Sequence, residues 1–202
     1  MLKNKFRALC QKFSKDEALI TVLWQEIEIT HSQSTRYYHR LKHLEHIYKE
    51  LETFEITPLL EFAIFYHDIV YDAKRNDNER QSALVARERL EQLTVPQKLN
   101  EQVFQLIVET KIHNASSEEN KLFLDADLSI LGSKEKNYNK YIQNVRKEYA
   151  IYNDTTYFTS RRKILEMFLE KERIYESEHF YDLYENKARK NLEQELKKFY
   201  SL

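Results

Sequence analysis

The chain contains very few of the residues that build tight turns, with one glycine and two prolines among 202 residues. Sheets joined by tight hairpins need residues that adopt a positive φ, which are usually glycine or asparagine. Glycine-rich phosphate loops need several glycines close together, whereas Gly132 stands alone. The composition therefore excludes P-loop and Rossmann chemistry, and it predicts an all-α protein.

Cysteines, long apolar runs and an excess of one charge are also missing. The single cysteine, Cys10, excludes an internal disulfide framework and a cysteine zinc cluster. No apolar run reaches the length of a membrane span, and the N-terminal stretch lacks a signal-peptide core. The net charge of −1 gives no overall basic field for nucleic acid. We therefore expect a cytoplasmic protein with no membrane partner and no clear nucleic-acid signature, and homo-oligomerisation stays open.

The most informative stretch is Leu59–Asp72, which reads LLEFAIFYHDIVYD. Its first two thirds are apolar on every side of a helix, and such a helix is normally buried. Thr57 and Pro58 form a typical helix start. His67 and Asp68 lie in the last third of this expected helix, and a buried carboxylate is costly unless it is paired or binds a metal. The simpler alternative is a hydrogen-bonded core histidine beside a capping aspartate.

Three histidines lie close together upstream, in the segment Arg36–His46. If this segment is helical, His39, His43 and His46 lie at positions i, i+4 and i+7, opposite the apolar face. Two imidazoles spaced i, i+4 can converge on one ion or substrate. A solvated histidine face is the alternative.

Further polar groups lie on apolar helical faces downstream. Glu79 shares the apolar stripe of a helix that begins at residue 78 or 79, although a first-turn glutamate also complements the helix dipole. His113 ends the buried stripe of the helix that Pro96 opens, and structural and functional interpretations of it are balanced. Asp127 lies on the apolar face of the next helix, and Asp125 points about 160° away from it around the axis.

The composition changes after Gly132, where the chain becomes rich in tyrosine, lysine and glutamate. We expect one domain over residues 1–202, with a metal-site core at about 30–132 and a helical extension at about 133–202. The last helix is expected over residues 179–200. Arg146, in this extension, could give bidentate contacts to a phosphate, with a salt-bridged surface as the simpler alternative.

Taken in chain order, His43, His67, Asp68 and Asp127 form a His … His-Asp … Asp series on expected helices. This series resembles the HD-domain superfamily, whose members are all-α metal-dependent phosphohydrolases. The resemblance implies that these four residues bind the metal.

Two flanking stretches are similar to the cyclic-nucleotide phosphodiesterases of the same superfamily. They are Tyr38-His39-x-x-x-His43 and the Asp-Leu-Ser that begins at Asp127. In those enzymes the first histidine donates a proton and the second binds metal, which implies that His39 is the acid and His43 the ligand. A second register, with His39 as the ligand in an Arg36-x-x-His39 pattern, also occurs in HD proteins and stays open.

Nearly the whole chain is similar to a bacterial group of predicted metal-dependent HD-superfamily phosphohydrolases. The resemblance implies an HD-type helical bundle with additional C-terminal helices. It implies no substrate, and the short chain shows no recognisable purine pocket. The chain shares five short stretches with this group: RxYH at Arg36–His39, HDxxYD at His67–Asp72, NExxSA at Asn78–Ala83, DADL at Asp125–Leu128 and RxEY at Arg146–Tyr149.

Two imidazoles and two carboxylates suit one divalent ion of Mn, Fe, Co, Ni or Zn, and a second, oxygen-rich position suits Mg. Asp68 could bridge two ions, with Glu79 nearby as a further catalytic group. His113, Arg36 and Arg146 are then expected to bind the phosphate of the substrate.

We therefore predict a metal-dependent phosphohydrolase that acts on a nucleotide or another small phosphate ester through metal-activated water. One alternative is a di-iron HD oxygenase, in which His46 and His113 supply extra ligands. The other alternative is a non-catalytic HD module that binds a nucleotide or a partner.

Overall fold

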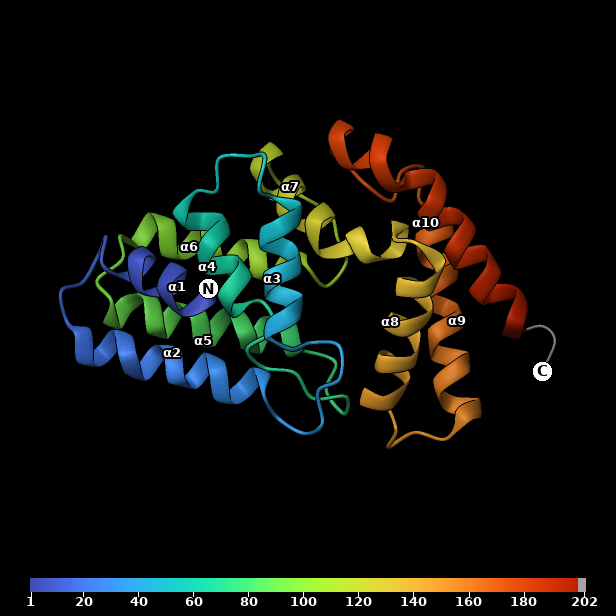
Figure 1. Ribbon diagram of the computed structural model, residues 1–202, viewed down its shortest axis with the longest axis horizontal. Coiled ribbons are helices and arrows are strands. Elements are labelled where there is room, and N and C mark those ends of the chain that lie inside the picture. The colour runs from blue at the N-terminus through green and yellow to red at the C-terminus, as the bar shows by residue number, and fades with distance from the viewer. Residues whose placement is uncertain (200–202) are drawn as a thin grey trace. The chain divides into compact units, whose positions relative to one another are not determined.

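The computed structural model describes residues 1–199, which form ten α-helices and one short 3-10 helix and contain no strand (Figure 1). This confirms the all-α prediction. Tyr200, the last residue of the expected final helix, lies outside the described residues. The chain divides into two compact units, Met1–Leu124 and Asp125–Leu202, and the border falls inside helix α7 (Glu118–Leu128).

The first unit is built around helix α4 (Pro58–Tyr66), which contacts four other helices. The Thr57 hydroxyl accepts a hydrogen bond from the Leu60 amide, and Pro58 is the first helical residue, as the sequence predicts. Leu60 and every residue from Phe62 to Tyr66 are completely buried. The helices of this unit before α7 are α1 (Leu2–Cys10), α2 (Glu17–His31), α3 (Leu41–Glu50), α4, α5 (Asn78–Gln92) and α6 (Gln97–Glu109).

Helix α4 ends at Tyr66, so the expectation of a helix over Leu59–Val70 is wrong in its last part. His67 is the C-cap of the helix, and Asp68 lies in the turn that follows. The Asp68 carbonyl accepts a hydrogen bond from Arg36. The turn is therefore held by a contact with a residue far away in the sequence.

The second unit contains the end of α7 and four further elements. Gly132 lies where η1 approaches α10, and a Cβ at this position would come within 2.5 Å of the Tyr184 Cβ. The only glycine in the chain thus permits a close helix approach. The further elements are η1 (Ser129–Gly132), α8 (Glu135–Glu148), α9 (Asp154–Glu170) and α10 (Glu178–Phe199).

Three buried charged groups of the second unit, Arg161, Glu195 and Asp125, are paired with groups of that unit. Arg161 and Glu195 form a buried ion pair through contacts of 2.8 and 3.0 Å. Asp125 accepts hydrogen bonds from the Glu176 amide and from both the amide and the hydroxyl of Ser177, which lie just before α10. These contacts fix the helices of the unit to one another and to their connections.

None of the helices within residues 1–199 has the length and apolar character needed to cross a membrane.

Candidate metal centre

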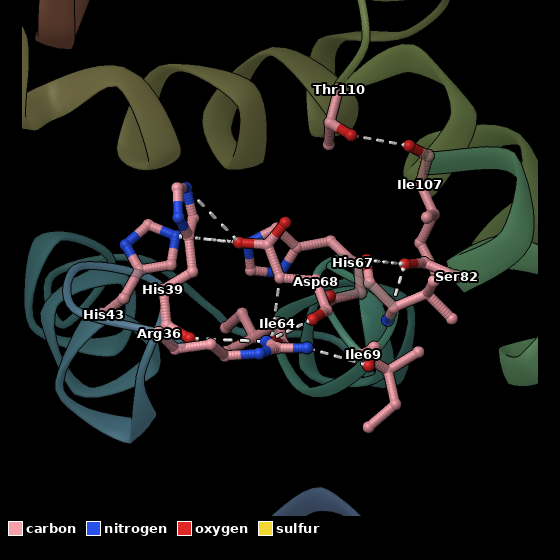
Figure 2. A network of polar contacts seen from close by, with 12 residues as sticks. Arg36, His39, His43, Ile64, His67, Asp68, Ile69, Ser82, Ile107 and Thr110 are labelled. Atoms are coloured by element: carbon pink, nitrogen blue, oxygen red, sulfur yellow. Dashed lines mark hydrogen bonds and ion pairs between the residues drawn. The ribbon is translucent and has the colours of Figure 1, made fainter. Parts of the chain in front are cut away.

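Three side chains of the first unit bring potential metal ligands together (Figure 2). The Nε2 atoms of His43 and His67 are 3.1 Å apart. The Asp68 Oδ2 atom lies 3.1 Å from His67 Nε2 and 3.7 Å from His43 Nε2. Two ligand atoms that each lie about 2.0–2.2 Å from one ion can be at most about 4.4 Å apart. The three atoms are therefore close enough to bind one metal ion.

The main chain of α4 fixes which nitrogen of His67 faces this cluster. His67 Nδ1 lies 3.2 Å from the carbonyl oxygens of both Ala63 and Ile64. Because a carbonyl can only accept, Nδ1 carries the proton and donates it to these oxygens. In the neutral imidazole, Nε2 then presents its lone pair to His43 and Asp68, which is the tautomer that a metal ligand needs.

The carboxylate of Asp68 is held in its charged form. Burial would raise the pKa of Asp68, but when no ion is bound the positive charge of protonated His67, His39 and His43 outweighs that effect and holds the pKa well below its usual range. The side chains of His43 and His67 are only 2% exposed, whereas that of Asp68 is 18% exposed. An ion would therefore meet a negative charge and buried nitrogen ligands, and solvent reaches the cluster mainly beside Asp68.

Arg36 ties together the two loops that carry site residues. Its guanidinium donates hydrogen bonds to the carbonyl oxygens of Asp68 at 2.6 Å, Ile69 at 3.0 Å and His39 at 3.3 Å. The side chain is buried, with a relative exposure of 1%. The phosphate-binding role that the sequence predicts for Arg36 stays a prediction. In the structure its guanidinium bonds to the main chain of both loops.

His39 lies in the loop before α3, which begins only at Leu41. The expected helix across Arg36–His46 is therefore wrong in its first part, because Arg36 turns inward to the carbonyls described above. His39 Nε2 lies 4.0 Å from the Asp68 Oδ2 atom. His46 follows on α3, is half-buried, and lies 3.7 Å from Glu50 through its Nδ1. Of the three clustered histidines, His43 belongs to the group of potential metal ligands and His39 lies beside it.

Glu79 and His113 lie outside the group of three ligands in the described part of the chain. Glu79 is in the first turn of α5, half-buried, and its Oε2 atom is buried without a hydrogen-bond partner. His113 follows the end of α6 in a left-handed conformation, with φ of 49°, and is half-buried. It therefore does not continue the helical stripe from which its inward orientation was predicted. Roles for both residues in the chemistry stay predictions.

Asp127 and Arg146 belong to the second unit, and their assignments to the site also stay predictions. Asp127 is half-buried near the end of α7. The Arg146 guanidinium bonds to the Asp154 carboxylate at 2.7 Å and to the carbonyls of Tyr149 and Tyr152, both at 3.0 Å. These contacts give Arg146 a structural role at the α8–α9 connection.

Sequence reasoning missed His31 and Tyr71. His31 ends α2, four residues after the buried Ile27, and this helical spacing was the available signal. Its Nδ1 atom lies 2.9 Å from the Ile27 carbonyl oxygen, and burial, helped by the charge of Arg36, lowers the pKa of His31 to about 3. His31 is therefore neutral and adds no charge near Asp68. Tyr71 stacks on the His39 ring, a contact between two loops that no sequence pattern indicates.

Comparisons of the chain with protein-family models, with curated proteins and with solved structures find no match.

Proposed function

We propose that the protein is a metal-dependent phosphohydrolase of the HD type, whose centre lies in the first unit. The observation that carries the proposal is the convergence of Asp68 Oδ2 with the buried Nε2 atoms of His43 and His67. All three atoms can donate an electron pair, and a carboxylate beside imidazole nitrogens attracts a cation. The order of these ligands along the chain supports the HD interpretation.

His43, His67 and Asp68 would hold the ion. Such a mixture of nitrogen and oxygen ligands suits Mn, Fe, Co, Ni or Zn, and a second position rich in oxygen suits Mg. When bound, the ion would lower the pKa of a coordinated water and polarise a phosphoryl oxygen. The placement of His43 in the ligand group, with His39 beside it, supports the register in which His43 binds metal.

His39 is proposed as the general acid. Its Nε2 atom is 4.0 Å from Asp68, on the more exposed side of the cluster, and an imidazole titrates in the range needed near neutral pH. During hydrolysis the water oxygen bonds to phosphorus, and the bond from phosphorus to the leaving oxygen breaks. That oxygen takes the proton of His39, and the proton released by the water restores His39. The products are an alcohol and inorganic phosphate.

The proposed substrate is a nucleotide or another small phosphate ester. The test begins with protein purified without chelator, whose metal content is measured by mass spectrometry. Phosphate release is then screened over nucleotides and simple phosphate esters with each candidate metal. We expect one or two ions per chain and metal-dependent release of phosphate from at least one ester.

A matched pair of variants on α3 sharpens this test. His43→Ala should lose the ion, whereas His46→Ala, one turn further along the same helix, should keep both ion and activity because His46 lies beside Glu50. Equal metal content in the two variants would overturn the proposed centre. A bound metal without turnover on any ester would favour the non-catalytic alternative. No observation favours the di-iron oxygenase, since the ligand group of the described residues contains neither His46 nor His113.

A further inference from the structure

The ring of His39 packs face to face against the ring of Tyr71. The ring centroids are 4.0 Å apart and the planes are inclined by 28°. Tyr71 follows Asp68 by three residues, in the loop after α4. Its ring thus covers one face of the imidazole whose Nε2 atom lies 4.0 Å from Asp68.

Arg36 holds the two loops so that this stack can form. It bonds to the carbonyl of His39 in one loop and to the carbonyls of Asp68 and Ile69 in the other. Its guanidinium carbon also lies 5.7 Å from the centre of the Tyr71 ring. The main chain is therefore fixed on both sides of the stack, while the planes of the two rings determine where the His39 nitrogens point.

Because His39 lies in a loop, a helix does not set its rotamer. The Tyr38 ring meets the His39 ring edge-on at 4.9 Å and 87°, so Tyr71 provides the parallel face. A stacking contact uses the face of the imidazole and not its nitrogens. It can therefore orient the ring without engaging the atom that carries the transferred proton.

We propose that Tyr71 is a positioning residue for the general acid: its ring sets the plane of His39 so that Nε2 points toward the leaving oxygen of the substrate. This inference rests on the proposed phosphohydrolase function. Its chemical consequence is selective, since only substrates whose leaving group needs a proton depend on the orientation of His39.

The test compares Tyr71→Leu, which removes the aromatic face, with Tyr71→Phe, which keeps it. For an alkyl phosphate, kcat of Tyr71→Leu should fall about 10- to 100-fold, the range expected when a catalytic group is misplaced by about 1 Å, with little change in KM. For an aryl phosphate with a good leaving group, kcat should change less than about threefold. Tyr71→Phe should behave as the wild type on both esters, and all forms should keep their metal.

Two further measurements separate positioning from a general loss of structure. In the His39→Ala background, Tyr71→Leu should cause no additional loss on the alkyl ester, because the group that it positions is gone. In proton NMR spectra, the His39 ring signals should lie upfield in the wild type and in Tyr71→Phe, and should move downfield in Tyr71→Leu.

The outcomes distinguish the two proposals. If the wild type hydrolyses no ester with any metal, the proposed function is overturned and this role is overturned with it. If the wild type is active, three results for Tyr71→Leu would overturn the role of Tyr71 alone. They are an equal fall in kcat on both esters, a loss of metal, or a kcat on the alkyl ester equal to that of the wild type. Additive losses in the double variant would also contradict it.

Discussion

In the second unit the carboxylate of Glu195 accepts two hydrogen bonds from Arg161 and another from the Tyr138 hydroxyl. In the first unit the carboxylate of Asp68 instead lies 3.1 and 3.7 Å from the Nε2 atoms of His67 and His43. In the second unit, Arg161 supplies the positive charge that balances Glu195. In the first unit, Asp68 and the two histidines place electron-pair donors around one point, and a proton or a cation has to lie among them. The difference indicates that the polar interior of the second unit stabilises the fold, whereas that of the first unit could hold a metal ion.

Substitutions in the first-unit cluster should affect function most. Asp68→Ala should abolish both metal binding and hydrolysis, because it removes a ligand that is also proposed to bridge two ions. His39→Ala should keep its metal and lose about 10²–10⁴-fold in turnover on an alkyl ester, as expected for a general acid. Metal analysis and turnover on an alkyl and an aryl phosphate check both variants.

The same pair of variants decides the register of the ligands. Loss of metal from His39→Ala as complete as that from Asp68→Ala would make His39 the ligand and give His43 the outer role. Circular dichroism spectra of both variants should match the wild type, since neither residue belongs to the apolar core.

Substitutions of buried charges in the second unit should affect stability and not metal content. Glu195→Ala leaves the buried Arg161 without its partner and should lower the free energy of unfolding by about 3–5 kcal/mol. Urea unfolding followed by circular dichroism measures this loss. Glu193→Ala, on an exposed position of the same helix, is the control and should change stability by less than about 0.5 kcal/mol. If Glu195→Ala and Glu193→Ala changed the free energy of unfolding equally, the buried ion pair would not stabilise the second unit, and the contrast with the first unit would be lost.

Much of the first unit could be predicted from the sequence because its signals are local. The scarcity of glycine predicts the helical class, and Thr57-Pro58 predicts where α4 begins. The apolar stretch before His67 predicts burial of that histidine, and its relative exposure of 2% confirms this. These inferences depend only on residues within a few positions of each other.

The ends of the helices and the membership of the cluster could not be predicted in this way. Helix α4 stops at Tyr66, and the turn after it is held by Arg36, which lies thirty-two positions before Asp68 and donates a hydrogen bond to the Asp68 carbonyl. Helix α3 begins only at Leu41, after His39. Sequence spacing alone leaves His39 and His43 equivalent, and only the folded structure places His43 among the potential ligands with His39 beside them.

The single glycine gives a smaller test of packing in the second unit. Gly132→Ala should lower the free energy of unfolding by about 1–3 kcal/mol, because the added Cβ meets the main chain and Cβ of Tyr184. Urea unfolding measures the loss, with Ser133→Ala, the next residue along the chain, as the control. Activity per folded molecule should stay unchanged, and a stability equal to that of the wild type would contradict the close approach.

The smallest expected effect concerns Cys10 in the first unit. Burial, followed by the charge of Glu61, raises the pKa of the Cys10 thiol from 9.0 to about 12. The unfolded chain releases this proton at lower pH than the folded one, so the contribution of Cys10 to stability is present below pH 9 and is lost as the pH rises from about 9 toward 12.

Urea unfolding of the wild type and of Cys10→Ala at pH 8 and pH 10 measures this contribution. The difference in unfolding free energy between the two proteins should shift against the wild type at the higher pH. The same difference at both pH values would contradict the raised pKa. Cys10 in the folded Glu195→Ala variant should also react slowly with a thiol reagent at pH 8. The substitution is in the second unit, whereas Cys10 is buried within the first.

The border between the two units, between Leu124 and Asp125, has a practical consequence for anyone who wants to separate them. Proteases cut preferentially at exposed loop tips, and this border lies inside helix α7. Limited digestion is therefore expected to open connections such as residues 72–77 or 151–153 before it releases either unit intact. A gene divided before Glu118 would keep Asp125 with its partner Ser177, whereas one divided after Leu128 would remove the carboxylate that holds the start of α10.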